Sequence, residues 1–149
     1  MYDLMIKGGL LVDPSQGIHA VRDVAFSEGT VVAVEEGLDD GLARQVMDAS
    51  GKVVTPGLID LHAHVYHLVT PLSVEVDSSC LAKGTTTVLD VGSAGVATFP
   101  GFRRYIIEAC KTRVYALLNI NPLGLLPFRG EVKGRDLDVK EIVEMIEKN

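Results

Sequence analysis

The stretch VVTPGLIDLHAH, residues 53–64, decides the fold of this chain. After the turn dipeptide Pro56-Gly57, apolar residues alternate with Asp60, His62 and His64, which is the period of two that a strand has. The two imidazoles are therefore predicted to leave one face of the strand, near its C-terminal end. Neutral imidazoles are good ligands for zinc-like ions, so the pair predicts a metal site. The alternative is a pair of ordinary surface or hydrogen-bonded histidines.

Composition limits the classes of protein that the chain can belong to. It has 149 residues, 47% of them hydrophobic and 23% charged, which is typical of a soluble globular protein. The net charge of −6 and the scattered Lys and Arg exclude a nucleic-acid surface. Apolar runs such as residues 114–118 are far shorter than the ~20 residues of a membrane helix, and residues 1–20 lack a signal-peptide pattern. We expect a cytoplasmic protein in which Cys80 and Cys110 are small buried residues.

Residues 1–55 have the pattern of a small β domain. Extended segments at residues 4–6 and 10–12 flank Gly8-Gly9, and His19 is expected in the loop that follows them. Residues 21–26 and 31–34 flank a glycine-bearing turn and predict a β-hairpin. A further short strand is predicted at residues 45–48.

Residues 56–149 alternate between strand and helix patterns. Strands are predicted at residues 58–64, 85–91 and 113–120, and helices at 74–83, 101–110 and after Asp138, with a glycine-rich loop over 92–100 and a Pro/Gly-rich loop over 121–134. This order predicts parallel strands joined by crossover helices. Each βα unit takes about 30 residues, in line with a (β/α)8 TIM barrel of roughly 250 residues. We therefore expect an α/β fold that holds the first three βα units of such a barrel.

Three parallel strands cannot close into a barrel, because the two outer strands keep unpaired edges. We therefore expect this chain to be the N-terminal portion of a longer protein, with the remainder of the barrel on the same or a separate chain. By itself the chain is expected to be inactive and to bind zinc weakly or not stoichiometrically, because two histidines leave a tetrahedral ion underligated.

Four motifs are similar to those of a known family. They are PGLIDLHAH at residues 56–64, GTTTV at 84–88, DVGSAG at 90–95 and TFPGFRRY at 98–105. In these motifs the chain resembles the metal-dependent hydrolases of the amidohydrolase superfamily, and more narrowly their dihydroorotase-like deacetylase group. The resemblance implies that residues 1–55 are half of a small β-sandwich domain and that residues 56–149 begin the metal-bearing barrel.

The resemblance also implies a metal site and its chemistry. His62 and His64 would bind one or two Zn²⁺ ions, or another divalent metal, while the remaining ligands and the general-base aspartate would lie downstream. No catalytic residue is therefore assigned within this chain. A metal held in this way activates water to hydroxide and polarises the carbonyl group under attack. Asp60, expected on the same strand face as the histidines, would orient a ligand or serve a structural hydrogen bond.

Three residues are predicted to contact a small-molecule substrate. Tyr66 follows the ligands on the side where barrel active sites lie, and Asn119 ends the third strand. Ser93 lies in a glycine-rich loop whose backbone N–H groups would face a carbonyl or anionic group, unless that loop is only a tight turn. His67 is expected to be a loop histidine rather than a third ligand.

The substrate class follows from one departure from the family pattern. True dihydroorotases typically carry an arginine where this chain has Tyr66, so the resemblance favours hydrolysis of an amide or ester, as by a deacetylase or deacylase. The alternatives are a cyclic amidohydrolase of the dihydroorotase or hydantoinase type and a non-catalytic dihydroorotase-like scaffold partner. A full-length protein is expected to form a homo-oligomer that binds neither nucleic acid nor membrane.

Overall fold

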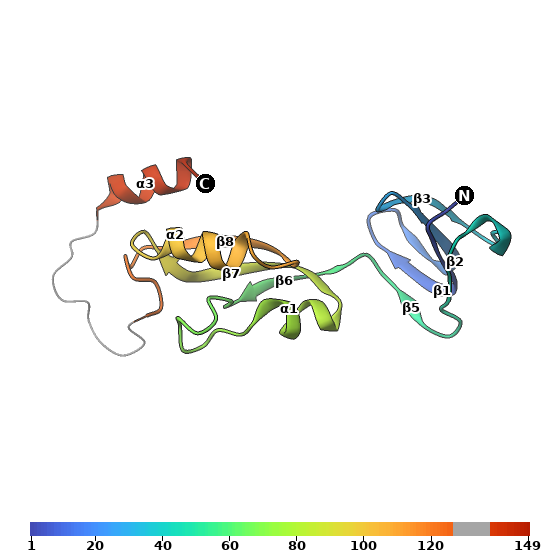
Figure 1. The fold of residues 1–149 in the computed structure, drawn as a ribbon, viewed down its shortest axis with the longest axis horizontal. Helices are drawn as coiled ribbons and strands as arrows, with labels where there is room; N and C mark the ends of the chain where they lie inside the picture. Colours follow the sequence, from blue (N-terminus) through green and yellow to red (C-terminus); the bar gives the residue numbers. More distant parts are fainter. Residues whose placement is uncertain (127–137) are drawn as a thin grey trace. The chain divides into compact units, whose positions relative to one another are not determined.

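The computed structural model describes residues 1–126 and 138–149, which form two compact units, Met1–Pro56 and Gly57–Asn149. The first unit is a five-stranded sheet (Figure 1). Its elements are β1 (Leu4–Asp13), β2 (Ile18–Ser27), β3 (Thr30–Glu35), the short 3-10 helix η1 (Asp40–Leu42), β4 (Val46–Asp48) and β5 (Val53–Val54). β1, β2 and β3 pair in antiparallel order, and β4 and β5 pair with β1 in parallel.

The first unit differs from the sequence prediction at two places. Gly8-Gly9 does not break the chain: β1 runs through it with a register shift between Ile6 and Gly9. Glycine is required there because a Cβ on Gly9 would lie 2.5 Å from Cγ2 of Val54. His19 was expected in a loop, which is wrong: it lies within β2 and pairs with Val12.

The second unit contains three parallel strands with β7 in the middle (Figure 1). The strands are β6 (Leu58–Ala63), β7 (Thr85–Gly95) and β8 (Arg113–Asn119). Between them lie α1 (Val76–Ser79), the 3-10 turn η2 (Leu81–Lys83), α2 (Phe99–Phe102) and the π-helical turn η3 (Arg103–Ile107), and α3 (Val139–Glu147) comes last. Parallel strands joined by helical crossovers confirm the predicted α/β fold class.

The core of this unit lies between one face of the sheet and the helical segments. Val88 and Val114 from the strands pack with Val76, Phe99 and Phe102 from the helices. Large side chains elsewhere on the outer strands are exposed, among them Ile59, Leu61, Tyr115 and Leu117. In the part of the chain that is described, the sheet is therefore covered on one side only.

The helices and the second strand have different bounds from those predicted. The predicted helix 74–83 is two short pieces, α1 and η2, which end at Gly84 with φ 89°, as the glycine signal indicates. The predicted loop at residues 92–100 is wrong in its first part, because β7 continues to Gly95. The strand resumes its pairing there, with Gly95 opposite Asn119 after a register shift. The predicted loop 121–134 lies partly outside the described residues.

The last helix begins where its capping signal places it. The Asp138 carboxylate accepts hydrogen bonds from the backbone N–H groups of Lys140 and Glu141, at 2.9 and 3.2 Å. None of the helices within residues 1–126 and 138–149 is long and apolar enough to cross a membrane.

Candidate metal centre

The end of β6 brings two imidazole rings together. His62 lies within the strand and His64 directly follows its last residue, Ala63. The ring centroids of the two histidines are 5.7 Å apart and the ring planes are nearly perpendicular, at 89°. Two imidazoles at this spacing, at the carboxyl end of a parallel strand, could both bind one metal ion.

Asp60 does not share the face of the two histidines, which corrects the prediction made from simple alternation. Asp60 pairs with Val88 on β7, whereas Ala63 pairs with Asp90. Between these two pairs β6 has one residue more than β7. Such a bulge places Asp60 and Ala63 on the same side, where Val88 is packed under the helices. The Asp60 carboxylate accepts a hydrogen bond from the backbone N–H of His62, at 2.9 Å. This hydrogen bond fits the structural alternative for Asp60, and its role in orienting a metal ligand stays a prediction.

The His64 ring is held from the neighbouring strand. Its Nδ1 lies 3.1 Å from Oγ of Ser93, near the end of β7. This contact uses Nδ1 and leaves Nε2 as the nitrogen that can bind a metal. Ser93 itself is fully buried, and its backbone N–H is donated to Asp90, so that N–H is not available to a substrate. A contact between Ser93 and substrate stays a prediction.

The position of Asp90 at the end of an apolar stretch of strand indicates either a residue that lines the site or a cap on the segment that follows. Its carboxylate is fully buried and accepts two backbone hydrogen bonds, from Val65 N at 2.8 Å and from Ser93 N at 2.7 Å. It thereby joins the residue after His64 to the residue that contacts the His64 ring. The only available signal was a carboxylate at the end of an otherwise apolar strand.

Tyr66 lies in the core. It is 8% exposed, its ring stands edge-on to Phe102 at a centroid distance of 4.9 Å, and its hydroxyl donates to the carbonyl oxygen of Thr98 at 3.2 Å. Burial raises the pKa of the hydroxyl, so it remains a neutral donor. The structure gives Tyr66 a packing role, and its contact with substrate stays a prediction.

Asn119 is also occupied by its own neighbourhood. Its side-chain nitrogen donates to the carbonyl oxygen of Gly92 at 2.8 Å, and its side-chain oxygen accepts from the backbone N–H of Asn121 at 2.8 Å. These bonds fix the turn after β8 against a Gly92 whose φ is 94°. Its predicted contact with substrate stays a prediction as well.

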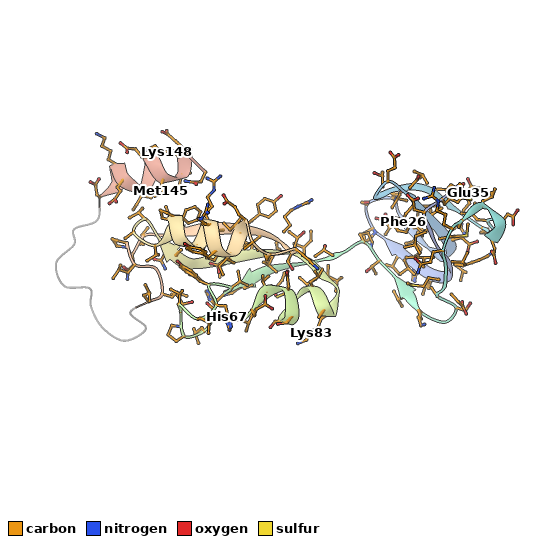
Figure 2. All side chains as sticks on the ribbon, in the orientation of Figure 1. Phe26, Glu35, His67, Lys83, Met145 and Lys148 are labelled. Carbon is orange, nitrogen blue, oxygen red and sulfur yellow. The ribbon has the colours of Figure 1, made fainter. Side chains whose placement is uncertain are left out.

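His67 is separate from the histidine pair. Figure 2 labels it in the segment between β6 and α1, where it lines a cavity of about 350 Å³ together with Glu75, Asp77 and Cys110. Its Nδ1 is buried without a hydrogen-bond partner among the described residues. Both acids already accept backbone hydrogen bonds, Glu75 from α1 and Asp77 from Lys111 and Thr112.

The histidine pair fits a metal ion but supplies only part of its ligands. Neutral imidazole is a suitable donor for zinc, and a tetrahedral ion needs four ligands. Within residues 1–126 and 138–149 there is no cluster of three or more His, Cys, Asp or Glu side chains that could hold a metal. Among the described residues, His62 and His64 could therefore supply two of the ligands that a metal ion needs.

Comparisons with known proteins agree with this fold and this motif. A deacetylase of Agrobacterium fabrum is 37% identical over 127 residues, which cover 82% of this chain and 31% of the relative. A solved dihydroorotase has a TM-score of 0.84 and 31% identity, and the match covers 98% of this chain and 39% of that one. A solved N-acyl-D-glutamate deacylase from Bordetella bronchiseptica, complexed with zinc and a phosphonate mimic of the tetrahedral intermediate, has a TM-score of 0.57 and 25% identity over 79% of this chain and 29% of that one. No protein-family model matches the chain.

Together, the β6 motif, the parallel βα units and these relatives define the class of the chain, the hydrolytic enzymes of the amidohydrolase family. The chain belongs to the amidohydrolase superfamily and matches the N-terminal region of its members. It spans about a third of the length of the curated relatives that it matches, 31% of the deacetylase and 32% of a dihydroorotase.

Proposed function

We propose that this chain supplies the first two metal ligands, His62 and His64, of a metal-dependent hydrolase that cleaves an amide or ester bond in a small acylated molecule. The observation that carries the proposal is the convergence of the two rings at the end of β6, 5.7 Å apart, with Nε2 of His64 left free. The remaining ligands and the proton-transferring group would come from residues outside those that the structure describes.

The chemistry divides between the bound ion and the residues of this chain. A divalent ion lowers the pKa of water and polarises a carbonyl oxygen, which are the two needs of amide hydrolysis. His62 and His64 would hold the ion at the carboxyl end of β6, the end of a barrel at which reactions occur. The buried core around Val65 and Tyr66 keeps the segment after the ligands in one position.

The proposed substrate class rests on the relatives and on Tyr66. Two of the similar proteins carry the names deacetylase and deacylase, and both activities remove an acyl group by hydrolysis. Tyr66 stands at the position where dihydroorotases typically hold a carboxylate with arginine, and its buried hydroxyl, which donates to the Thr98 carbonyl oxygen, carries no positive charge. These features favour an acylated amine or alcohol over dihydroorotate.

A second candidate is a cyclic amidohydrolase of the dihydroorotase type. It is supported by the structural match, since the TM-score to the solved dihydroorotase is higher than that to the deacylase. Substituting this chain for the matched segment of the Agrobacterium fabrum deacetylase would separate the two candidates. We expect the hybrid to hydrolyse N-acetylated substrates in preference to dihydroorotate; the reverse preference would favour the second candidate.

A zinc titration of the chain followed by ¹⁵N NMR of the histidine rings tests the metal-binding step. We expect the ring nitrogens of His62 and His64 to shift together with the same weak affinity, while those of His19 and His67 stay unchanged. His62→Ala and His64→Ala should each remove most of the affinity, because either change leaves one imidazole. His19→Ala, a histidine change in the other unit, is the matched control. Unchanged His62 and His64 signals at saturating zinc would refute the proposal.

A further inference from the structure

We propose that Ser93 is a positioning residue for His64, and that Asp90 holds Ser93 at the required place. The inference rests on the proposed function in one respect, that His64 is a metal ligand. The contact that suggests it is the 3.1 Å distance between His64 Nδ1 and Ser93 Oγ, made between two neighbouring parallel strands.

Hydrogen bonds and close packing hold the backbone of Ser93 in place. It is fully buried, its N–H donates to Asp90 at 2.7 Å, and its carbonyl oxygen accepts from Leu125 N at 3.1 Å. The chain also passes so close that a Cβ on Gly124 would lie 2.1 Å from the Ser93 carbonyl oxygen. A hydroxyl on a backbone held in this way has little freedom, so its position determines where the His64 ring can lie.

Asp90 sets the distance between the ring and the hydroxyl. One carboxylate oxygen accepts from Val65 N, next to His64 in the chain, and the other accepts from Ser93 N. The main chain beside the ligand and the main chain of its partner are therefore joined through one buried side chain. A change at Asp90 would move both ends of the contact.

The contact has a consequence for metal binding. When Nε2 of His64 binds a metal, Nδ1 carries the ring proton and donates a hydrogen bond to Ser93 Oγ. This hydrogen bond fixes the tautomer of the ring and makes Nε2 a better ligand. The His62 ring has no such partner: within residues 1–126 and 138–149 no side chain makes a hydrogen bond to it. The two ligands are thus unequal, with His64 held in advance and His62 free to turn.

Ser93→Ala removes the hydroxyl with the smallest change in volume, and Ser78→Ala, an exposed serine in α1, is the matched control. We expect Ser93→Ala to weaken zinc binding about 10–100-fold, the usual effect of losing a hydrogen-bond partner of a metal-bound histidine. In the metal-free chain it should shift the ¹⁵N signals of the His64 ring and leave those of His62 in place. Ser78→Ala should change neither.

The outcomes separate this inference from the proposed function. Unchanged His64 signals and unchanged zinc affinity in Ser93→Ala would overturn the positioning role while leaving the metal site intact. His64 signals that respond to Ser93→Ala in a chain that binds no zinc would refute the metal site and keep the contact. If Ser93→Ala does not fold, the contact is tested in the wild-type chain by NMR. We expect a nuclear Overhauser effect between the His64 ring protons and the Ser93 β-protons, and its absence would overturn the inference.

Discussion

At the scale of single residues, two carboxylates near the sheet hold backbone segments together. Asp90 accepts hydrogen bonds from Val65 and Ser93 beside the candidate metal centre. Asp77 in α1 accepts hydrogen bonds from the N–H groups of Lys111 and Thr112 and from the Thr112 hydroxyl, where the chain enters β8. Each carboxylate accepts backbone N–H groups that a neighbouring strand would otherwise pair, because the segments that it joins are not paired in a strand ladder.

Asp90→Ala should destabilise the second unit by about 2–6 kcal/mol, because it leaves two buried N–H donors without an acceptor at about 1–3 kcal/mol each. Asp90→Asn keeps one acceptor oxygen and should cost less. Urea unfolding followed by a probe within Gly57–Asn149 measures both. Equal stability of the wild-type and Asp90→Ala chains would show that the two donors find other acceptors.

Asp77 makes stability depend on pH. The backbone N–H groups of Lys111 and Thr112 lower its pKa below the ordinary value of 3.8. Because the folded-state pKa is the lower one, the contribution is fully present above the unfolded pKa and is lost as the pH falls through the folded pKa. We expect the difference in unfolding free energy between wild type and Asp77→Asn to be constant from pH 7 to about 5 and to shrink below pH 4. A difference that grows on acidification would contradict this assignment.

The proximity of the His62 and His64 rings could be predicted from the sequence, because alternation along a strand puts residues two apart on one face. His62 lies within the register shift between Asp60 and Ala63, and His64 follows it. Asp60 lies on the other side of that shift, so the same rule assigned it to the wrong face. The roles of Asp90 and Ser93 depend on pairing between strands and on a turn near Leu125, which a local pattern does not contain.

At the scale of elements, β7 extends further along the chain than the sequence predicts. Gly92 and Gly95 resemble loop residues, yet the strand runs to Gly95 and pairs there with Asn119. The glycine at the end of this strand leaves room for a neighbouring backbone segment that lies close to it. A Cβ on Gly95 would lie 1.9 Å from the carbonyl oxygen of Asn121. Composition indicated a loop, whereas the packing requires the same glycines in a strand.

Gly95→Ala should therefore destabilise the second unit by about 1–3 kcal/mol, the usual cost of forcing an extra carbon into a packed site. Gly41→Ala is the control, because a Cβ there would meet its nearest atom at 3.4 Å. Thermal unfolding of both variants tests the comparison. A Gly95→Ala chain as stable as Gly41→Ala would mean that the segment at Asn121 moves aside without cost.

At the scale of the whole molecule, the described residues, 1–126 and 138–149, cover the three-stranded sheet on one side only. Leu61 on the edge strand β6 is 70% exposed, and Tyr115 and Leu117 are exposed on the other outer strand, β8. Uncovered apolar side chains and unpaired strand edges promote association between chains. The fold class could be predicted from the alternation of strands and helices. No local sequence pattern predicts which segment or chain covers the exposed face of the sheet.

We expect the chain to self-associate as its concentration rises, and Leu61→Lys to reduce that association, because a charge on an edge strand opposes edge-to-edge pairing. Leu68→Lys is the control, since Leu68 is a 90% exposed leucine outside the strands. Light scattering over a concentration series gives the weight-average mass of each chain. A wild-type chain that remains monomeric over the whole series would contradict the expectation.

Anomalous diffraction at the zinc edge, from crystals of the chain grown with zinc, tests the central claim most directly. The account predicts a peak between the two rings at the end of β6, about 2.0–2.1 Å from one nitrogen of His62 and from Nε2 of His64. Zinc bound at His19 or His67, or to His62 and His64 through separate ions, would contradict it.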